Sequence, residues 1–168
     1  KGLGVAFADY DNDGFTDVFV ANDSVQCFFY HNNGNGMFSE VGLLAGVGYN
    51  EDGKTFAGMG VDFSDYDNDG LPDIVVTDLS NQRYMLFRNN GDGSFRDATN
   101  QSGLGSATMM FSGWSTRLFD YDNDGWKDLF VAQSHVMDTI EKTSSNLSYL
   151  EPPLLLRNLS GHFSRVDA

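Results

Sequence analysis

Residues 9–17 have the sequence Asp9-Tyr10-Asp11-Asn12-Asp13-Gly14-Phe15-Thr16-Asp17. The pattern returns at residues 65–73 as Asp65-Tyr66-Asp67-Asn68-Asp69-Gly70-Leu71-Pro72-Asp73, and at residues 120–128 as Asp120-Tyr121-Asp122-Asn123-Asp124-Gly125-Trp126-Lys127-Asp128. We call these segments the three Asp loops and number each from position 1 to position 9. The first Asp recurs after 56 and then 55 residues, and self-similarity at such a period indicates a repeat protein.

A second segment recurs behind each loop. It reads Asn32-Asn33-Gly34-Asn35-Gly36-Met37-Phe38, then Asn89-Asn90-Gly91-Asp92-Gly93-Ser94-Phe95, then a shortened Asn158-Leu159-Ser160-Gly161-His162-Phe163. Asn and Gly adopt the positive φ angles of tight hairpins, and the intervening runs are rich in β-branched and aromatic residues. Each unit therefore predicts four short strands, which in about 55 residues is the size of one β-propeller blade.

The predicted fold is all-β, with three four-stranded antiparallel blades in a single propeller segment spanning residues 1–168. The blades cover residues 1–50, 51–107 and 108–168, and the third carries an inserted loop at 133–153. Known propellers have about 4–8 blades, so three are not expected to close a ring. We expect either a larger parent propeller of about seven blades or open blade edges covered by other chains, including further copies of this one.

The Asp loops predict three Ca²⁺ sites, one per repeat. The predicted ligands are the carboxylates at positions 1, 3, 5 and 9 and the backbone carbonyl at position 7, because Ca²⁺ takes about 6–8 oxygen ligands. In order, they are Asp9, Asp11, Asp13, Phe15 and Asp17; Asp65, Asp67, Asp69, Leu71 and Asp73; and Asp120, Asp122, Asp124, Trp126 and Asp128. Glycine at position 6 permits the sharp turn.

The loops resemble EF-hand loops as far as position 9. An EF-hand has Glu at position 12, whereas Val20, Val76 and Val131 stand there in this chain. We expect the position-9 Asp to replace that Glu, with water completing the shell. The alternative is a solvated, metal-free acidic turn. Mg²⁺ fits the loops less well, because it keeps several of its bound water ligands. Zn²⁺ also fits less well, because the loops lack the Cys and His ligands that it prefers.

The formal net charge of −14 is concentrated in these loops. Twelve of the 24 acidic residues lie there, and removing those twelve charges takes −14 to −2. A chain with ten Lys and Arg argues against nucleic-acid binding, and no apolar run is long enough to insert into a membrane. The single cysteine, Cys27, is expected to be a buried hydrophobic residue.

Together, the Asp loop and the Asn-Gly hairpin resemble the FG-GAP/VCBS repeat family of β-propellers, which includes the integrin α-subunit head. Gly113-Trp114-Ser115-Thr116, His135-Val136 and Leu156-Arg157-Asn158 narrow the resemblance to the cartilage-acidic-protein-1-like group, whose members often carry an ASPIC/UnbV domain. This resemblance implies a secreted, extracellular or cell-surface protein, with a periplasmic location as the alternative. It implies adhesion or interaction with a protein or glycan more than catalysis.

Other functional signals are weaker. The 133–153 insertion is expected to fold over the propeller face, with a binding loop as the alternative, and His135 within it is expected to be structural. Trp114 and Trp126 are expected in the blade core. Glycosylation motifs begin at Asn22, Asn100, Asn146 and Asn158. No catalytic set is recognised, and the alternative function, part of a calcium-dependent polysaccharide lyase, is disfavoured by the scattered Lys and Arg.

Overall fold

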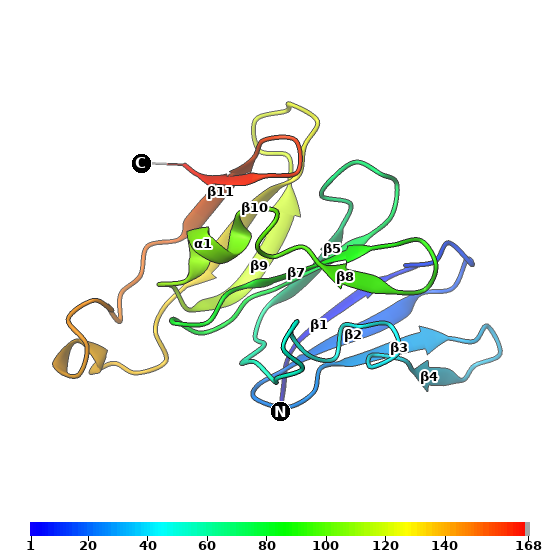
Figure 1. Ribbon diagram of the computed structural model, residues 1–168, viewed down its shortest axis with the longest axis horizontal. Coiled ribbons are helices and arrows are strands. Elements are labelled where there is room, and N and C mark those ends of the chain that lie inside the picture. Colours follow the sequence, from blue (N-terminus) through cyan, green and yellow to red (C-terminus); the bar gives the residue numbers. More distant parts are fainter. Residues whose placement is uncertain (167–168) are drawn as a thin grey trace.

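The computed structural model describes residues 1–166, which form three four-stranded antiparallel sheets (Figure 1). Blade 1 contains β1 (Gly2–Ala8), β2 (Asp17–Asn22), β3 (Phe28–Asn32) and β4 (Phe38–Glu40). Blade 2 contains β5 (Val61–Ser64), β6 (Asp73–Val76), β7 (Met85–Asn89) and β8 (Phe95–Asp97). Blade 3 contains β9 (Gly113–Phe119), β10 (Asp128–Gln133), β11 (Leu154–Asn158) and β12 (Phe163–Arg165). In each sheet the strands are hydrogen-bonded in chain order.

Strand register places the two recurring turns at the same end of every blade. The position-9 Asp begins the second strand and pairs with the residue before position 1, as in Ala8 opposite Asp17. The hairpin Asn ends the third strand and pairs with the Phe that begins the fourth, as in Asn89 opposite Phe95. The Asp loop and the Asn-Gly hairpin of one blade therefore lie next to each other.

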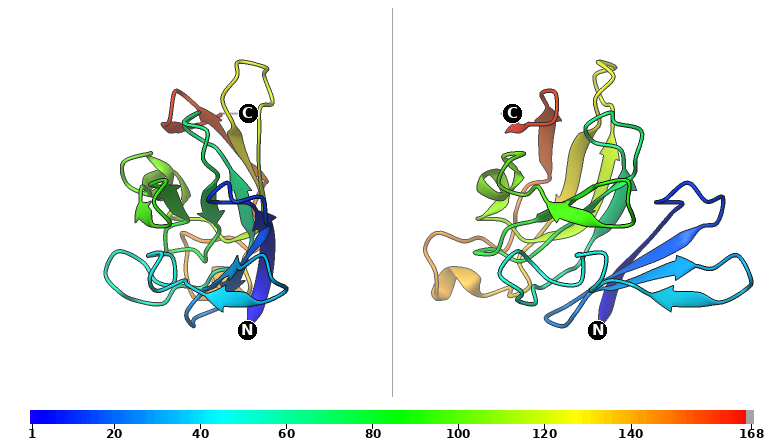
Figure 2. Two further views of the ribbon diagram at one scale, coloured as in Figure 1. Left: turned by 90° about the vertical axis from the view of Figure 1, so that its right-hand side faces the viewer. Right: turned by 45° about the vertical axis from the view of Figure 1, so that its right-hand side comes forward.

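The blades stand side by side like those of a propeller. Strand β1 packs beside β5 and β5 beside β9, so the first strand of each blade lies at a common inner edge (Figure 2). One hydrophobic core fills the space between blades 1 and 2 and includes Phe19, Phe29 and Phe87. A second core, between blades 2 and 3, includes Leu86, Leu129 and Leu156. The predicted all-β fold and four-stranded blades are confirmed.

The two outer faces of this stack remain open. We call the outward side of blade 1 the back face; an apolar hollow of about 300 Å³ on it is lined by Val18, Val20, Tyr30 and Phe38. The outward side of blade 3, the front face, exposes Tyr121 and Phe130 by 37% and 39%. Both faces therefore carry partly exposed apolar side chains.

Short helical segments interrupt the β structure. Helix α1 (Leu104–Thr108) follows β8, and a 3₁₀ turn (Ile140–Lys142) lies within the insertion that joins β10 to β11. Among residues 1–166, no helix is long and apolar enough to cross a membrane. The expectation of a core position for Trp114 is wrong: the residue is 44% exposed, and its Nε1 donates to the Ser134 carbonyl at 2.7 Å.

Candidate metal centres

Each Asp loop has the same backbone shape. The Asn at position 4 has positive φ, at 59° for Asn12, 60° for Asn68 and 61° for Asn123. The glycine at position 6 has φ of 89–90° in all three loops, a conformation that a side chain would strain. The position-1 carboxylate accepts hydrogen bonds from the N–H groups of positions 5 and 6 at 2.9–3.1 Å. These bonds curl the loop around its own first Asp.

The position-9 Asp joins the loop to the hairpin. One oxygen accepts the N–H of position 2, and the other accepts the N–H of the hairpin Asn, at 2.8–3.2 Å throughout. The side chains concerned, Asp17, Asp73 and Asp128, are fully buried. A carboxylate in this place holds two turns together and faces the loop interior.

The loops bring carboxylates together. In the second loop, one oxygen each from Asp65, Asp67 and Asp73 lie within 4.8 Å of one another. In the third loop, Asp120, Asp122 and Asp128 form the equivalent group. These are positions 1, 3 and 9 of the predicted ligand set, and their all-oxygen chemistry suits a hard divalent cation.

Position 3 supplies an unsatisfied oxygen. Asp67 Oδ1 and Asp122 Oδ1 are buried and have no hydrogen-bond partner among the described residues. Their second oxygens are paired, Asp67 with Arg88 and Asp122 with Arg157, the latter at 2.7 Å. A buried carboxylate oxygen without a partner is costly, and a bound cation would satisfy it.

Position 5 completes the same ion-pair network. Arg88 Nη2 lies 2.8 Å from Asp69, and Arg157 Nη2 lies 3.0 Å from Asp124. The same carboxylates accept the N–H of position 7, from Leu71 at 2.9 Å and Trp126 at 2.9 Å. The structure therefore places position 5 beside the group formed by positions 1, 3 and 9, although Asp69 and Asp124 are not among its members. The position-7 carbonyls remain predicted ligands.

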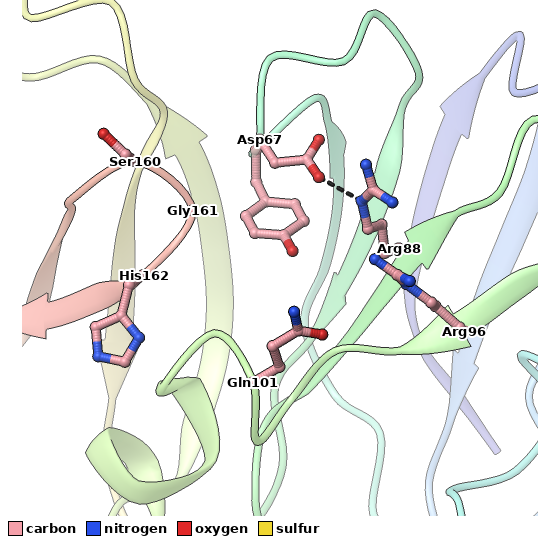
Figure 3. Close-up of a pocket in the computed structure, with 8 residues that line it drawn as sticks. Asp67, Arg88, Arg96, Gln101, Ser160, Gly161 and His162 are labelled. Atoms are coloured by element: carbon pink, nitrogen blue, oxygen red, sulfur yellow. Dashed lines mark hydrogen bonds and ion pairs between the residues drawn. The ribbon is translucent and has the colours of Figure 1, made fainter.

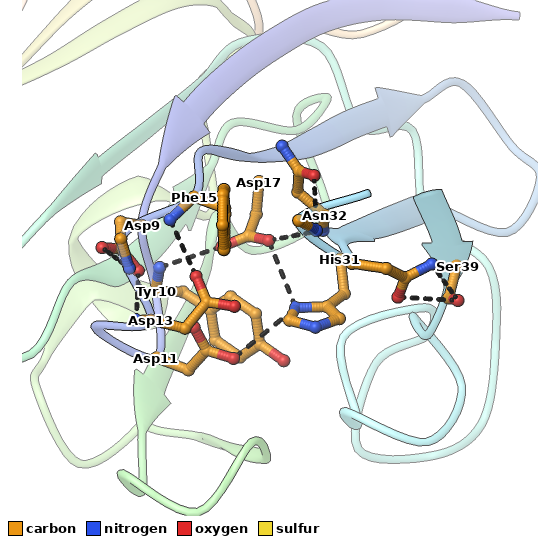
Figure 4. Close-up of polar contacts among 12 residues, drawn as sticks. Asp9, Tyr10, Asp11, Asp13, Phe15, Asp17, His31, Asn32 and Ser39 are labelled. Atoms are coloured by element: carbon orange, nitrogen blue, oxygen red, sulfur yellow. Dashed lines mark hydrogen bonds and ion pairs between the residues drawn. The ribbon is translucent and has the colours of Figure 1, made fainter. Parts of the chain in front are cut away.

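The first loop has a different neighbour. His31 stands where Arg88 and Arg157 stand in the other blades, and its Nδ1 lies 3.5 Å from Asp11 Oδ2 and 3.3 Å from Asp17 Oδ1 (Figure 4). This nitrogen is buried without a hydrogen bond. Two overlapping groups result, one of Asp9, Asp11 and Asp13 and the other of Asp11, Asp17 and His31.

The FG-GAP-like repeat family matches residues 9–76 and 65–131, which contain all three Asp loops. The chain belongs to this family. Its resemblance to cartilage acidic protein 1 is also found: the Xenopus tropicalis protein is 28% identical over 131 residues, which are 77% of this chain and 19% of that protein. The Mus musculus protein is 32% identical over 98 residues, 57% of this chain and 15% of that protein. The chain thus spans less than a fifth of these relatives.

Among solved structures, this FG-GAP-like chain is similar to that of an Agrocybe aegerita lectin described as specifically recognising non-reducing terminal N-acetylglucosamine. The TM-score is 0.48 with 20% sequence identity, over 95% of this chain and 36% of that one.

Burial raises the pKa of carboxylates in the Asp loops of this FG-GAP-like chain. It raises the pKa of Asp73 to about 7; Asp67 and Asp69 push in the same direction, and N–H groups of Asn89 and Tyr66 oppose it. Burial likewise raises the pKa of Asp17. Without a cation, these carboxylates resist ionisation because charge is held in a poorly solvated site.

Sequence reasoning missed the basic residue behind each loop. His31, Arg88 and Arg157 each immediately precede the hairpin Asn, so the signal was present in the repeat alignment. No role is predicted for His31 from the sequence. The structure shows that it shares a register with two arginines that contact the acidic loops.

The remaining candidates have structural roles. Cys27 is fully buried, as expected, and burial raises its pKa to about 11. His135 is also buried, and its Nδ1 accepts the N–H of Met137 at 3.0 Å, which agrees with a structural role. Two predicted glycosylation sites are buried: Asn22 Nδ2 donates to the Gln26 carbonyl, and Asn158 Nδ2 to the Tyr66 carbonyl. Those two side chains are inaccessible in this fold.

Proposed function

We propose that the chain is an extracellular interaction scaffold in which each Asp loop holds one Ca²⁺. The observation that carries the proposal is the buried, unpartnered oxygen at position 3, Asp67 Oδ1 or Asp122 Oδ1, beside the carboxylates of positions 1 and 9. The carboxylates of positions 1, 3, 5 and 9 and the position-7 carbonyl would hold the ion. Bound Ca²⁺ would supply positive charge to a site that concentrates four carboxylates.

The protein's own residues supply the rest of the site. Arg88 and Arg157 bind the outer oxygens of positions 3 and 5, which leaves the inner oxygen at position 3 free. Because the position-9 Asp also bonds the hairpin, neutralising it would stabilise two turns together. The loops therefore brace the blades and leave the faces and edges for partners.

An extracellular location is supported by the family and by the relatives' name, which refers to cartilage. A protein or glycan is the proposed partner, and further FG-GAP-like repeats are proposed to cover the two open faces. The alternative of a calcium-dependent polysaccharide lyase is not favoured by any contact among the described residues.

Thermal melting tests whether Ca²⁺ binds the folded chain and stabilises it. The melting temperature should fall when Ca²⁺ is removed with EGTA and recover on Ca²⁺ addition but not with Mg²⁺ alone. A ligand at 100 times its Kd stabilises a one-site protein by about 2.7 kcal/mol. Calorimetric titration should count three sites in the wild type.

Matched variants locate the ions. Asp67→Asn and Asp122→Asn should each remove one site, whereas Asp52→Asn, which changes an exposed carboxylate outside the loops, should leave the count at three. A melting temperature that is the same in EGTA and in Ca²⁺ would refute the proposal.

A further inference from the structure

A polar hollow of about 390 Å³ lies between blades 2 and 3 on the side of the Asp loops (Figure 3). Arg88 and Arg96 approach it from blade 2, Gln101 from the turn after β8, and Ser160 and His162 from the hairpin of blade 3. We propose that this hollow binds an acidic sugar, with the sugar carboxylate held by Arg96 and the hydroxyls by Gln101, Ser160 and His162.

Arg96 has the free charge that such a ligand needs. Four of the six arginines pair with carboxylates: Arg83, Arg88, Arg117 and Arg157. Arg165 lies over the Phe111 ring at 5.1 Å. Within residues 1–166, Arg96 has neither kind of partner. In a chain of net charge −14, an unpaired guanidinium lining a hollow is a site for an anion.

The junction between blades 1 and 2 provides an internal comparison. The hairpin of blade 2 approaches the Asp loop of blade 1: a Cβ added to Gly93 would lie 4.0 Å from Tyr10 Oη. The hairpin of blade 3 approaches the Asp loop of blade 2 as closely: a Cβ added to Gly161 would lie 3.9 Å from Asp67 Cβ. At the first junction, however, Ser39 replaces Arg96 and Asp92 replaces Ser160. Blades 1 and 2 pack together with Ser39 at this position, which indicates that Arg96 is not required for blade packing.

The size and lining of the hollow favour a sugar. Its volume lies in the range of small-ligand sites, about 300–1,000 Å³. Amide, hydroxyl and imidazole groups offer both donors and acceptors, which match the many hydroxyls of a saccharide. Asp67 also lines the hollow; Arg88 pairs with one of its oxygens, and the other is the buried oxygen proposed to bind Ca²⁺. With Ca²⁺ bound, a carboxylate ligand would therefore meet a compensated acidic residue and a free guanidinium.

The test is calorimetric titration of the full chain in saturating Ca²⁺ with D-galacturonate, D-galactose and sodium sulfate. Galacturonate should bind and galactose should not. Arg96→Ser, which installs the residue found in blade 1, should weaken galacturonate at least about tenfold, or 1.4 kcal/mol. Gln101→Ala should weaken it less, and Arg83→Ser, a change in an arginine outside the hollow, should not.

Equal binding of galactose, or unchanged galacturonate binding by Arg96→Ser, would overturn the proposal. Sulfate binding as tightly as galacturonate would overturn the sugar assignment in favour of a simple anion site. The inference rests on the proposed function, because bound Ca²⁺ would compensate the charge of Asp67. A chain that melts in a Ca²⁺-dependent manner yet does not bind galacturonate would refute this inference alone.

Discussion

Asn89 in blade 2 donates a hydrogen bond from Nδ2 to the backbone carbonyl of Tyr10, in the Asp loop of blade 1, at 2.8 Å. Blade 3 repeats the contact, from Asn158 to the Tyr66 carbonyl at 2.7 Å. Each Asn also donates to a carbonyl of its own loop. One side chain thus ties the loop of its blade to the loop of the preceding blade.

Removing this tie should destabilise the stack. Asn89→Ala and Asn158→Ala each leave buried carbonyls without a donor, and we expect a loss of about 1–3 kcal/mol in the free energy of unfolding. Asn32→Ala is the matched control, because Asn32 Nδ2 donates only to the Thr16 carbonyl of its own loop. Urea unfolding measures all three, and an equal loss in the control would contradict an inter-blade role.

Aromatic stacking follows the same repeat and predicts self-association. Tyr10 stacks on Phe95 with ring centroids 5.8 Å apart, and Tyr66 on Phe163 at 6.0 Å. The equivalent residues at the ends, Phe38 and Tyr121, are 49% and 37% exposed. We expect a further copy to bring its Tyr121 onto Phe38, because this reproduces the contact found twice within the chain.

Sedimentation velocity at increasing concentration tests this pairing. The wild type should associate head to tail, and Phe38→Ser or Tyr121→Ser should shift it to monomer. Leu44→Ser removes a side chain that is 86% exposed outside these faces and should have no effect. A wild-type chain that stays monomeric at every concentration would rule the contact out.

The inner strands approach so closely that glycine is required. A Cβ on Gly4 would collide with the Met59 carbonyl, and one on Gly60 would lie 2.9 Å from the Trp114 carbonyl. Gly4→Ala and Gly60→Ala should therefore each cost about 1–3 kcal/mol by overpacking. Ser115, at the same register of blade 3, is exposed, and Ser115→Ala should be neutral in thermal melting. Equal losses at all three positions would argue against a steric cause.

Asp78 makes stability depend on pH. Burial raises its pKa to about 7, although Leu79 and Ala57 donate N–H bonds to it. Because the pKa of Asp78 is higher in the folded than in the unfolded state, its protonated carboxyl stabilises the fold at low pH, and this contribution is lost as the pH rises to about 7. Asp78→Asn cannot ionise, so it should avoid this loss of stability while keeping an acceptor oxygen. The gain in melting temperature over wild type should grow from about pH 4 to about pH 7, reaching several degrees; a constant difference would contradict this.

The repeat, the strand order and the turns were predictable from sequence because they depend on local chemistry. Positive φ at Asn12 and Gly14 and their equivalents is encoded residue by residue, and alternating apolar runs place strands between the turns. The convergence of positions 1, 3 and 9 also follows from a short loop. The exposed position of Trp114 was not predictable, since it depends on tertiary contacts such as the hydrogen bond from its Nε1 to the Ser134 carbonyl.

The sequence by itself determined three Asp loops, each set in a four-stranded blade. Only the tertiary structure decided which carboxylate oxygens are buried without a partner and which basic side chains contact the loops. It alone brought Arg96 and His162 to one hollow and left Phe38 and Tyr121 at opposite ends of the stack. The physical reason is that turn geometry is set by neighbouring residues, whereas burial and charge pairing arise between strands that meet only when the blades pack.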